Sequence, residues 1–165
     1  MKKVYLDKSR ENKCISVFLK DVEVVLAGTT VNVMSVKHKN EEYQKFAEVY
    51  DVHFIFEDNV PKMDFYTIPM VDIFTVDSVG GYIGSLGQVT DLEADVPICY
   101  IDAQKKSYVI ASNGKEWLDN IRKWREKLTP YDSIEFYESI EDTQEKYEFI
   151  DTNELEELLP YRIVK

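Results

Sequence analysis

The chain has 165 residues, 44% of them hydrophobic and 13% aromatic, which suits a single domain with a substantial core and excludes a chain that is disordered throughout. Its net charge of −11 makes nucleic acid a poor partner, because a surface this negative repels phosphate backbones. The sequence contains neither a run of about eighteen apolar residues nor an apolar stretch behind the N-terminal lysines. We therefore expect a cytoplasmic protein with no membrane contact.

The acidic side chains are concentrated in two parts of the chain. Residues 129–165 carry eleven acidic side chains against three basic ones, and residues 41–114 carry thirteen against four. If folding brings these two segments onto one body, we expect a continuous negative surface, which would attract basic proteins.

The first predicted element is a β-hairpin. Val22, Val24 and Leu26 alternate with other residues, and Val31 and Val33 alternate again after Ala-Gly-Thr-Thr. A helix over residues 14–26 is the alternative, which the many β-branched residues there disfavour.

Asn40 is the expected N-cap of a helix, since aromatic residues follow it at helical spacing up to Tyr50. Two strand-like apolar runs come next, at residues 52–56 and 65–76. Pro69 predicts that the second run bends, splits or lies at a sheet edge.

The strongest turn signal is Asp-Ser-Val-Gly-Gly at residues 77–81, and we expect at least one of Gly80 and Gly81 to have a positive φ angle. Residues 97–101 and 107–111 then read as an antiparallel hairpin around a short polar connection. After Asn113 we expect one helix up to Leu128, opened by a capping box with Glu116. Its apolar stripe comprises Trp117, Leu118, Ile121, Trp124 and Leu128.

The acidic C-terminal part is expected to form a second hairpin, from residues 134–140 and 146–150, rich in glutamates. A capping box of Asp151 and Glu154 predicts a last short helix that ends before Pro160.

The sequence offers little catalytic chemistry. Its histidines are His38 and His53, and the apolar surroundings of His53 favour a structural role. Cys14 and Cys99 lie among apolar residues and are expected to be buried small hydrophobes. Gly80, Gly81, Gly84 and Gly87 resemble a phosphate-binding loop only in spacing, because a strand-like stretch follows where such a loop would open a helix. We therefore expect no catalytic residue, no cofactor and no metal.

Carboxylates provide the one alternative to a protein without catalytic function. Asp91, Glu93 and Asp95 alternate and could point the same way, and with Asp102 they could converge on one pocket of a small-ligand or metal-dependent enzyme. A solvated loop before Pro97 is the simpler interpretation.

Several stretches together resemble the SMI1/KNR4 family of the SUKH superfamily. They are Pro-Met-Val-Asp-Ile-Phe at residues 69–74, Asp-Ser-Val-Gly-Gly-Tyr at 77–82, Pro-Ile-Cys-Tyr-Ile-Asp at 97–102, and Tyr-Val-Ile-Ala at 108–111 followed by Glu-Trp-Leu at 116–118. The resemblance covers about residues 64–128. It implies an α+β fold with a central, mostly antiparallel, curved sheet flanked by helices. It further implies either an immunity-type protein that neutralises a toxin such as a nuclease, or a regulatory scaffold.

The leading hypothesis is thus that the protein is a binding module for a basic protein partner, such as a toxin domain. The residues expected to contact that partner are acidic side chains near the C-terminal end: Glu135, Glu138, Glu141, Asp142, Glu145 and Glu148.

Overall fold

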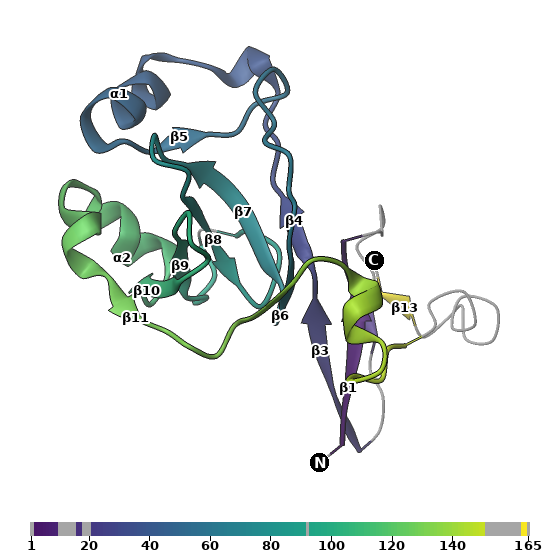
Figure 1. Ribbon diagram of the computed structural model, residues 1–165. Helices are drawn as coiled ribbons and strands as arrows, with labels where there is room; N and C mark the ends of the chain where they lie inside the picture. Colours follow the sequence, from purple (N-terminus) through teal and green to yellow (C-terminus); the bar gives the residue numbers. More distant parts are fainter. Residues whose placement is uncertain (1, 10–15, 18–20, 92, 151–162, 165) are drawn as a thin grey trace.

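The computed structural model describes residues 2–9, 16–17, 21–91, 93–150 and 163–164 (Figure 1). The fold is α+β, as expected, and its centre is a mostly antiparallel sheet of seven strands in the order β11-β10-β9-β8-β7-β4, with β5 also paired to β7. In chain order these strands are β4 (Thr29–Val31), β5 (His53–Phe54), β7 (Val71–Val76), β8 (Tyr82–Leu86), β9 (Ile98–Ile101), β10 (Ser107–Ala111) and β11 (Thr129–Pro130). Only the pairing of β4 with β7 is parallel.

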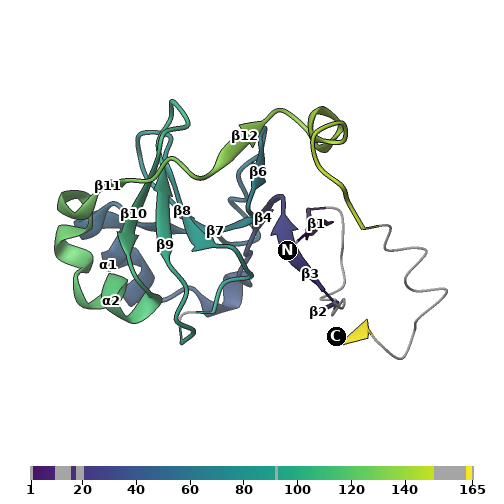
Figure 2. The same ribbon diagram turned by 90° about the horizontal axis from the view of Figure 1, so that it is seen from below.

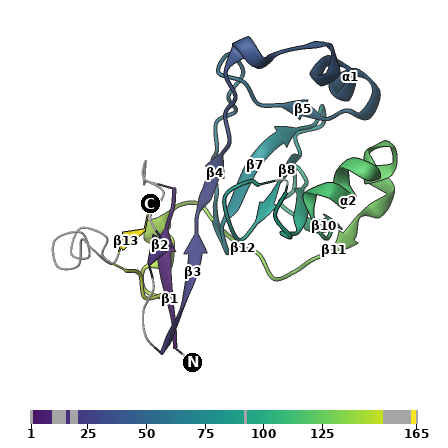
Figure 3. The same ribbon diagram turned by 180° about the vertical axis from the view of Figure 1, so that it is seen from behind.

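Three further two-stranded sheets lie outside the central sheet. They pair β1 (Lys2–Asp7) with β3 (Val22–Ala27), β6 (Tyr66–Ile68) with β12 (Glu135–Tyr137), and β2 (Ser16–Val17) with β13 (Ile163–Val164). The first of these pairings is parallel. Figures 2 and 3 show β1 and β3 to one side of the central sheet, away from α1 and α2.

The helical elements are η1 (Val36–His38), α1 (Glu41–Tyr50), α2 (Gly114–Asp119), η2 (Ile121–Lys127) and η3 (Ile140–Thr143). Asn40 caps α1 through its side chain, which accepts hydrogen bonds from the amides of Glu42 and Tyr43. This confirms the predicted N-cap. Within the described residues, no helix is both long and apolar enough to cross a membrane.

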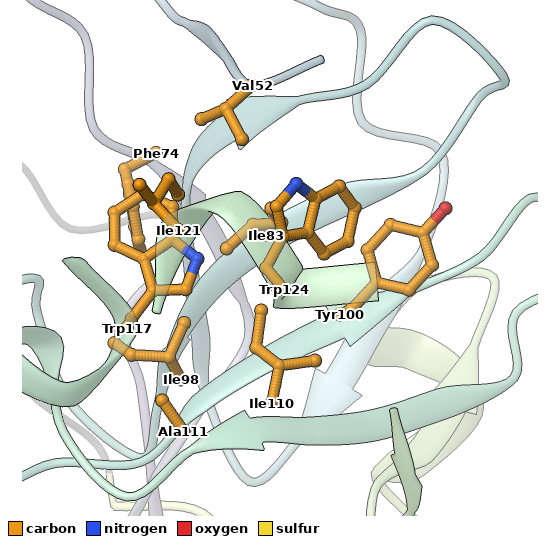
Figure 4. Packing of buried hydrophobic residues seen from close by; sticks show 10 residues of the cluster. All are labelled: Val52, Phe74, Ile83, Ile98, Tyr100, Ile110, Ala111, Trp117, Ile121 and Trp124. Atoms are coloured by element: carbon orange, nitrogen blue, oxygen red, sulfur yellow. The ribbon is translucent and has the colours of Figure 1, made fainter. Parts of the chain in front are cut away.

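Apolar side chains cover both faces of the central sheet. On one face, rings from α1, α2 and η2 pack on the strands. Figure 4 shows the buried part of this cluster around Trp117 and Trp124. On the other, Phe65 and Ile134 cover Cys99 and Ile101. The alternation along β9 sends successive side chains to opposite faces, which explains why all four of its residues are buried.

The predicted hairpin at residues 22–33 is wrong, although its strands exist. β3 pairs in parallel with β1, and β4 pairs in parallel with β7, so the two segments never pair with each other. Gly28, with a φ of 112°, redirects the chain from one sheet to the next. An alternating pattern identifies a half-buried strand but not its partner, which here lies far away in sequence.

The expected single helix up to Leu128 is interrupted. α2 ends at Asp119, and the side-chain amide of its C-cap residue, Asn120, donates to the carbonyl of Glu116 and competes with the helical hydrogen bonds. η2 follows as short 3₁₀ turns on either side of a kink at Lys123, whose backbone is not helical, and both Ile121 and Trp124 are buried. Leu118 lies outside the core and is 37% exposed, contrary to its place in the predicted stripe.

The remaining expectations have mixed outcomes. The run at residues 65–76 splits at Pro69 into β6 and β7, and the hairpin of β9 and β10 forms as predicted. The acidic hairpin is wrong, because β12 pairs with β6 and Phe149 bridges Tyr5, with η3 between them. The predicted helix after Asp151 and the residue Cys14 lie outside the described residues.

Candidate functional site

The candidate binding residues belong to what we term the acidic segment, residues 135–148, which crosses from β12 through η3 towards β1. Its apolar side chains point inward: Ile140 is 7% exposed, and Tyr137 and Tyr147 pack with it against Tyr66 and Ile68 of β6. With these anchors fixed, the intervening acidic side chains are left on the outside.

The backbone of the acidic segment is ordered by local hydrogen bonds. Thr143, which is fully buried, donates its hydroxyl to the carbonyl of Ile140 over 2.6 Å and accepts the amides of Lys146 and Tyr147 at its own carbonyl. Beyond it, the amide of Tyr5 in β1 donates to the carbonyl of Glu148. The carboxylates therefore project from a fixed backbone.

Glu135 differs from the other predicted contact residues, because its charge is used inside the protein. Its carboxylate accepts hydrogen bonds from Lys146 Nζ at 2.6 Å, from the Tyr137 hydroxyl at 2.7 Å and from the Tyr147 hydroxyl. Lys146 and Tyr147 together lower the pKa of Glu135 to about 2. This residue fastens the two ends of the acidic segment to each other.

Five of the predicted carboxylates are exposed. Glu148 forms an ion pair of 2.8 Å with Lys2, and both side chains remain more than half exposed. Glu141 is likewise not without a partner. Among the described residues no cation forms an ion pair with Glu138, Asp142 or Glu145. Within the described part of the chain, these three side chains thus present negative charge without an ion-pair partner.

The turn after β7 has the expected residues at its centre. The carboxylate of Asp77 accepts hydrogen bonds from the amides of Val79 and Gly81, at 3.0 and 2.6 Å. Gly80 has a φ of 85°, so at least one of the paired glycines adopts a left-handed conformation, as predicted. Gly81 is needed for another reason: a Cβ there would lie 2.2 Å from the hydroxyl oxygen of Tyr100.

Substituting Gly81 and Gly87 should separate the cost of a steric clash from the cost of backbone strain. We expect Gly81→Ala to destabilise the protein by more than about 2 kcal/mol, since the ring of Tyr100 must move. Gly87→Ala is the matched control, because Gly87 has a φ of 90° but no atom near its missing Cβ. It should cost only about 1 kcal/mol. Urea unfolding measures both, and equal costs would rule out a clash at Gly81.

A polar cluster that the sequence did not reveal surrounds Asp77. The carboxylate of Asp77 has no exposed side-chain surface and accepts from the Tyr100 hydroxyl at 2.5 Å and from Arg125 at 3.1 Å. Arg125 also donates to Asp51 at 2.8 Å, and Asp51 in turn lies 2.8 Å from a ring nitrogen of His53. The cluster joins the end of α1, the turn and η2.

Electrostatics indicate that this cluster is a structural clamp. Burial alone would raise the pKa of Asp77, but hydrogen bonds from Tyr100, from the amides of Gly81 and Val79, and from Arg125 outweigh it and hold that pKa below its usual value. Burial and the proximity of Asp77 raise the pKa of Tyr100 to about 12. A general base poised near neutral pH would need the opposite shift in the carboxylate.

The depressed pKa of Asp77 predicts acid-sensitive stability. A carboxyl whose pKa is lower in the folded than in the unfolded state stabilises the fold above the unfolded pKa, about 3.9, and this contribution disappears as pH falls through the folded pKa. We expect Asp77→Asn to flatten the loss of stability between about pH 5 and pH 2. Urea midpoints measured across this range test it, with Asp91→Asn as an exposed control. A parallel pH profile for wild type and Asp77→Asn would contradict the assignment.

The four carboxylates of the enzyme alternative do not all meet. Glu93 and Asp95 line a hollow of about 730 Å³ beside α2, together with Lys115, Leu118 and Asp119. Asp102 is elsewhere, in the turn that follows β9. The carboxylate of Asp91 accepts a hydrogen bond from the amide of Glu93. In the described chain, no group of three or more histidine, cysteine and acidic side chains could hold a metal ion.

The remaining candidates are Cys99 and the two histidines. Cys99 is fully buried, and burial raises the pKa of its thiol to about 12, so the reactive thiolate is disfavoured. His53 is partly exposed beside Asp51, in the clamp described above, and His38 lies in η1.

Comparison with family models, with curated proteins and with solved structures finds no match for this chain. The likeness to the SMI1/KNR4 family therefore rests on the sequence motifs alone.

Proposed function

We propose that this protein is a non-catalytic binding module that recognises a basic protein through the exposed carboxylates of the acidic segment. The observation that carries the proposal is the arrangement of Glu138, Asp142 and Glu145, which are exposed, held on an ordered backbone and without an ion-pair partner among the described residues. Like charges held on one short segment repel one another, and a basic partner relieves that repulsion.

The family resemblance gives this proposal a more specific form. Immunity-type members neutralise a toxin, often a nuclease, and a nuclease must be basic to hold a phosphate backbone. An acidic inhibitor can occupy the same surface as a competing polyanion. Glu141, beside Asp142 in η3, belongs to the proposed contact, whereas Glu135 holds the segment in shape.

One observation favours the enzyme alternative. Glu93 and Asp95 share the hollow beside α2, and a small cationic ligand or substrate could enter it. A regulatory scaffold, the other role that the family resemblance implies, would use the same acidic segment and differs only in the identity of its partner.

The proposal is tested by using variants of the chain as bait. In the test variant, Glu138, Asp142 and Glu145 are replaced by lysine; in the control, Glu48, Glu57 and Glu126, which are exposed elsewhere, are replaced in the same way. The net charge of the two variants is equal. We expect a basic protein to copurify with the wild type and the control and to be lost from the test variant.

The association rate of that purified partner provides the quantitative result. Reversing three charges should slow association at least about tenfold at low salt and reduce its salt dependence. A partner that binds all three chains at the same rate would show that the acidic segment is not the binding surface.

A further inference from the structure

A groove runs along the edge of the central sheet, where the turn between β9 and β10 meets the segment that leads from β11 to β12. Its first part, of about 460 Å³, is lined by Tyr108, Tyr131 and Phe136 together with Lys105 and Lys106. Its second part, of about 420 Å³, shares Lys105 and Phe136 with the first. The two parts therefore adjoin each other at Lys105 and Phe136.

The turn that carries the lysines is held in a single conformation. The carboxylate of Asp102 accepts the amides of Gln104 and Lys106, each at 2.9 Å. The amide of Lys105 donates to the carbonyl of Asp102, and Lys105 has a φ of 62°. A fixed backbone reduces the entropy lost when these side chains bind a ligand.

The two lysines have no internal counter-ion among the described residues. The ammonium group of Lys105 lies 5.7 Å from the centroid of the Phe65 ring, and Lys106 is exposed. By contrast, Lys39 and Lys146 are each paired with a carboxylate.

The charge changes sign along the groove. The first part contains one carboxylate, Asp132, against both lysines. The second contains Asp64 and Glu138 against Lys105 alone. An anionic group is therefore favoured only in the first part, next to the rings of Tyr108 and Tyr131.

We propose that this groove binds an extended peptide segment of a partner protein in which a carboxylate side chain neighbours an aromatic one. The aromatic side chain packs against the rings of Tyr131 and Phe136, and the carboxylate pairs with the lysines. Pro130 in β11 has no amide hydrogen, which disfavours strand addition at this edge and favours recognition through side chains. Tyr131, Phe136 and both lysines line the same hollow, so a short peptide segment can contact the rings and the cations together. This inference does not depend on the proposed function, because the groove selects the opposite charge.

Short capped peptides test the proposal with defined probes. Acetyl-Gly-Glu-Trp-Gly-amide, its Gln analogue and its Lys analogue are titrated into the full chain, and amide chemical shifts are followed by NMR. We expect the Glu peptide to bind at least about threefold more tightly than the Gln peptide, the effect of one exposed ion pair. The shifts should centre on residues 105–108 and 131–136.

Variants of the chain identify the contacts. Lys105→Glu combined with Lys106→Glu should abolish the preference for the Glu peptide, whereas Lys37→Glu with Lys45→Glu, which alters the net charge equally on η1 and α1, should preserve it. Tyr131→Ala should weaken all three peptides, and its melting temperature shows whether it remains folded. Equal affinity for the three peptides, a preference for the Lys analogue, or shifts centred outside the groove would each overturn the proposal.

Discussion

Replacing Trp124 with alanine is expected to lower the free energy of unfolding by about 3–5 kcal/mol. The side chain is 3% exposed, packs at 5.2 Å from the ring of Tyr100, and carries the guanidinium of Arg125 over its own ring at 4.3 Å. Its indole nitrogen donates to the carbonyl of Tyr50 at 2.8 Å, so truncation also leaves that acceptor unpaired. A loss of this size is a large part of the stability of about 5–15 kcal/mol typical of a domain.

Equilibrium unfolding in urea measures this loss, and two controls separate its causes. Leu118→Ala on α2 should cost less than about 1 kcal/mol, because Leu118 is exposed. Trp124→Phe should cost more than Trp117→Phe, because the indole nitrogen of Trp117 has no hydrogen-bond partner to lose among the described residues. An unchanged urea midpoint for Trp124→Ala would contradict the placement of η2 on the sheet.

Replacing Asp77 with alanine is expected to cost about 3 kcal/mol, since it removes the common acceptor of the polar cluster. The amide of Gly81 and the hydroxyl of Tyr100 would lose their partner in a buried place. Arg125 would keep its contact with Asp51 and, being 41% exposed, would be partly solvated by water. For this reason we place the cost at the lower end of the range for broken buried ion pairs, about 3–5 kcal/mol.

Thermal and urea unfolding of a graded series test this prediction. Asp77→Asn retains an acceptor for the backbone amides and should be less destabilising than Asp77→Ala. Ser78→Ala alters the neighbouring exposed residue and should have a small effect. If Asp77→Ala were as mild as Ser78→Ala, the cluster would not stabilise the turn.

Features determined by neighbouring residues could be predicted from the sequence. Asn40 and Asn113 cap helices through amides two or three residues away, and the turn at residues 77–81 is closed by Asp77 within four residues. The strand positions were also largely correct. Each of these features depends on a short-range contact that the sequence pattern itself encodes.

Features determined by distant residues could not be predicted. The partner of β4 is β7, and nothing in an alternating valine pattern specifies that parallel pairing. Arg125 is an ordinary helical cation in the sequence, yet it joins Asp51, 74 positions away, to Asp77. In the candidate site, the exposure of Glu138 and Glu145 could be expected from the acidic composition of the segment. The hydrogen bonds that Glu135 accepts from Lys146 and Tyr147 could not, because they form only when those residues fold back over it.

Zero-length cross-linking to a cationic peptide tests most directly whether the acidic segment is the surface that receives a basic partner. A carbodiimide couples a carboxylate only to an amine in contact with it, so the peptide (Lys-Ala)₄-amide reports which acidic side chains it touches. Coupling to glycine amide under the same conditions corrects for the reactivity of each carboxylate. We predict that corrected peptide coupling is highest at Glu138, Asp142 and Glu145 and falls as salt is raised. Coupling that is highest at Asp91, Glu93 and Asp95, or that is uniform over all exposed carboxylates, would contradict the account.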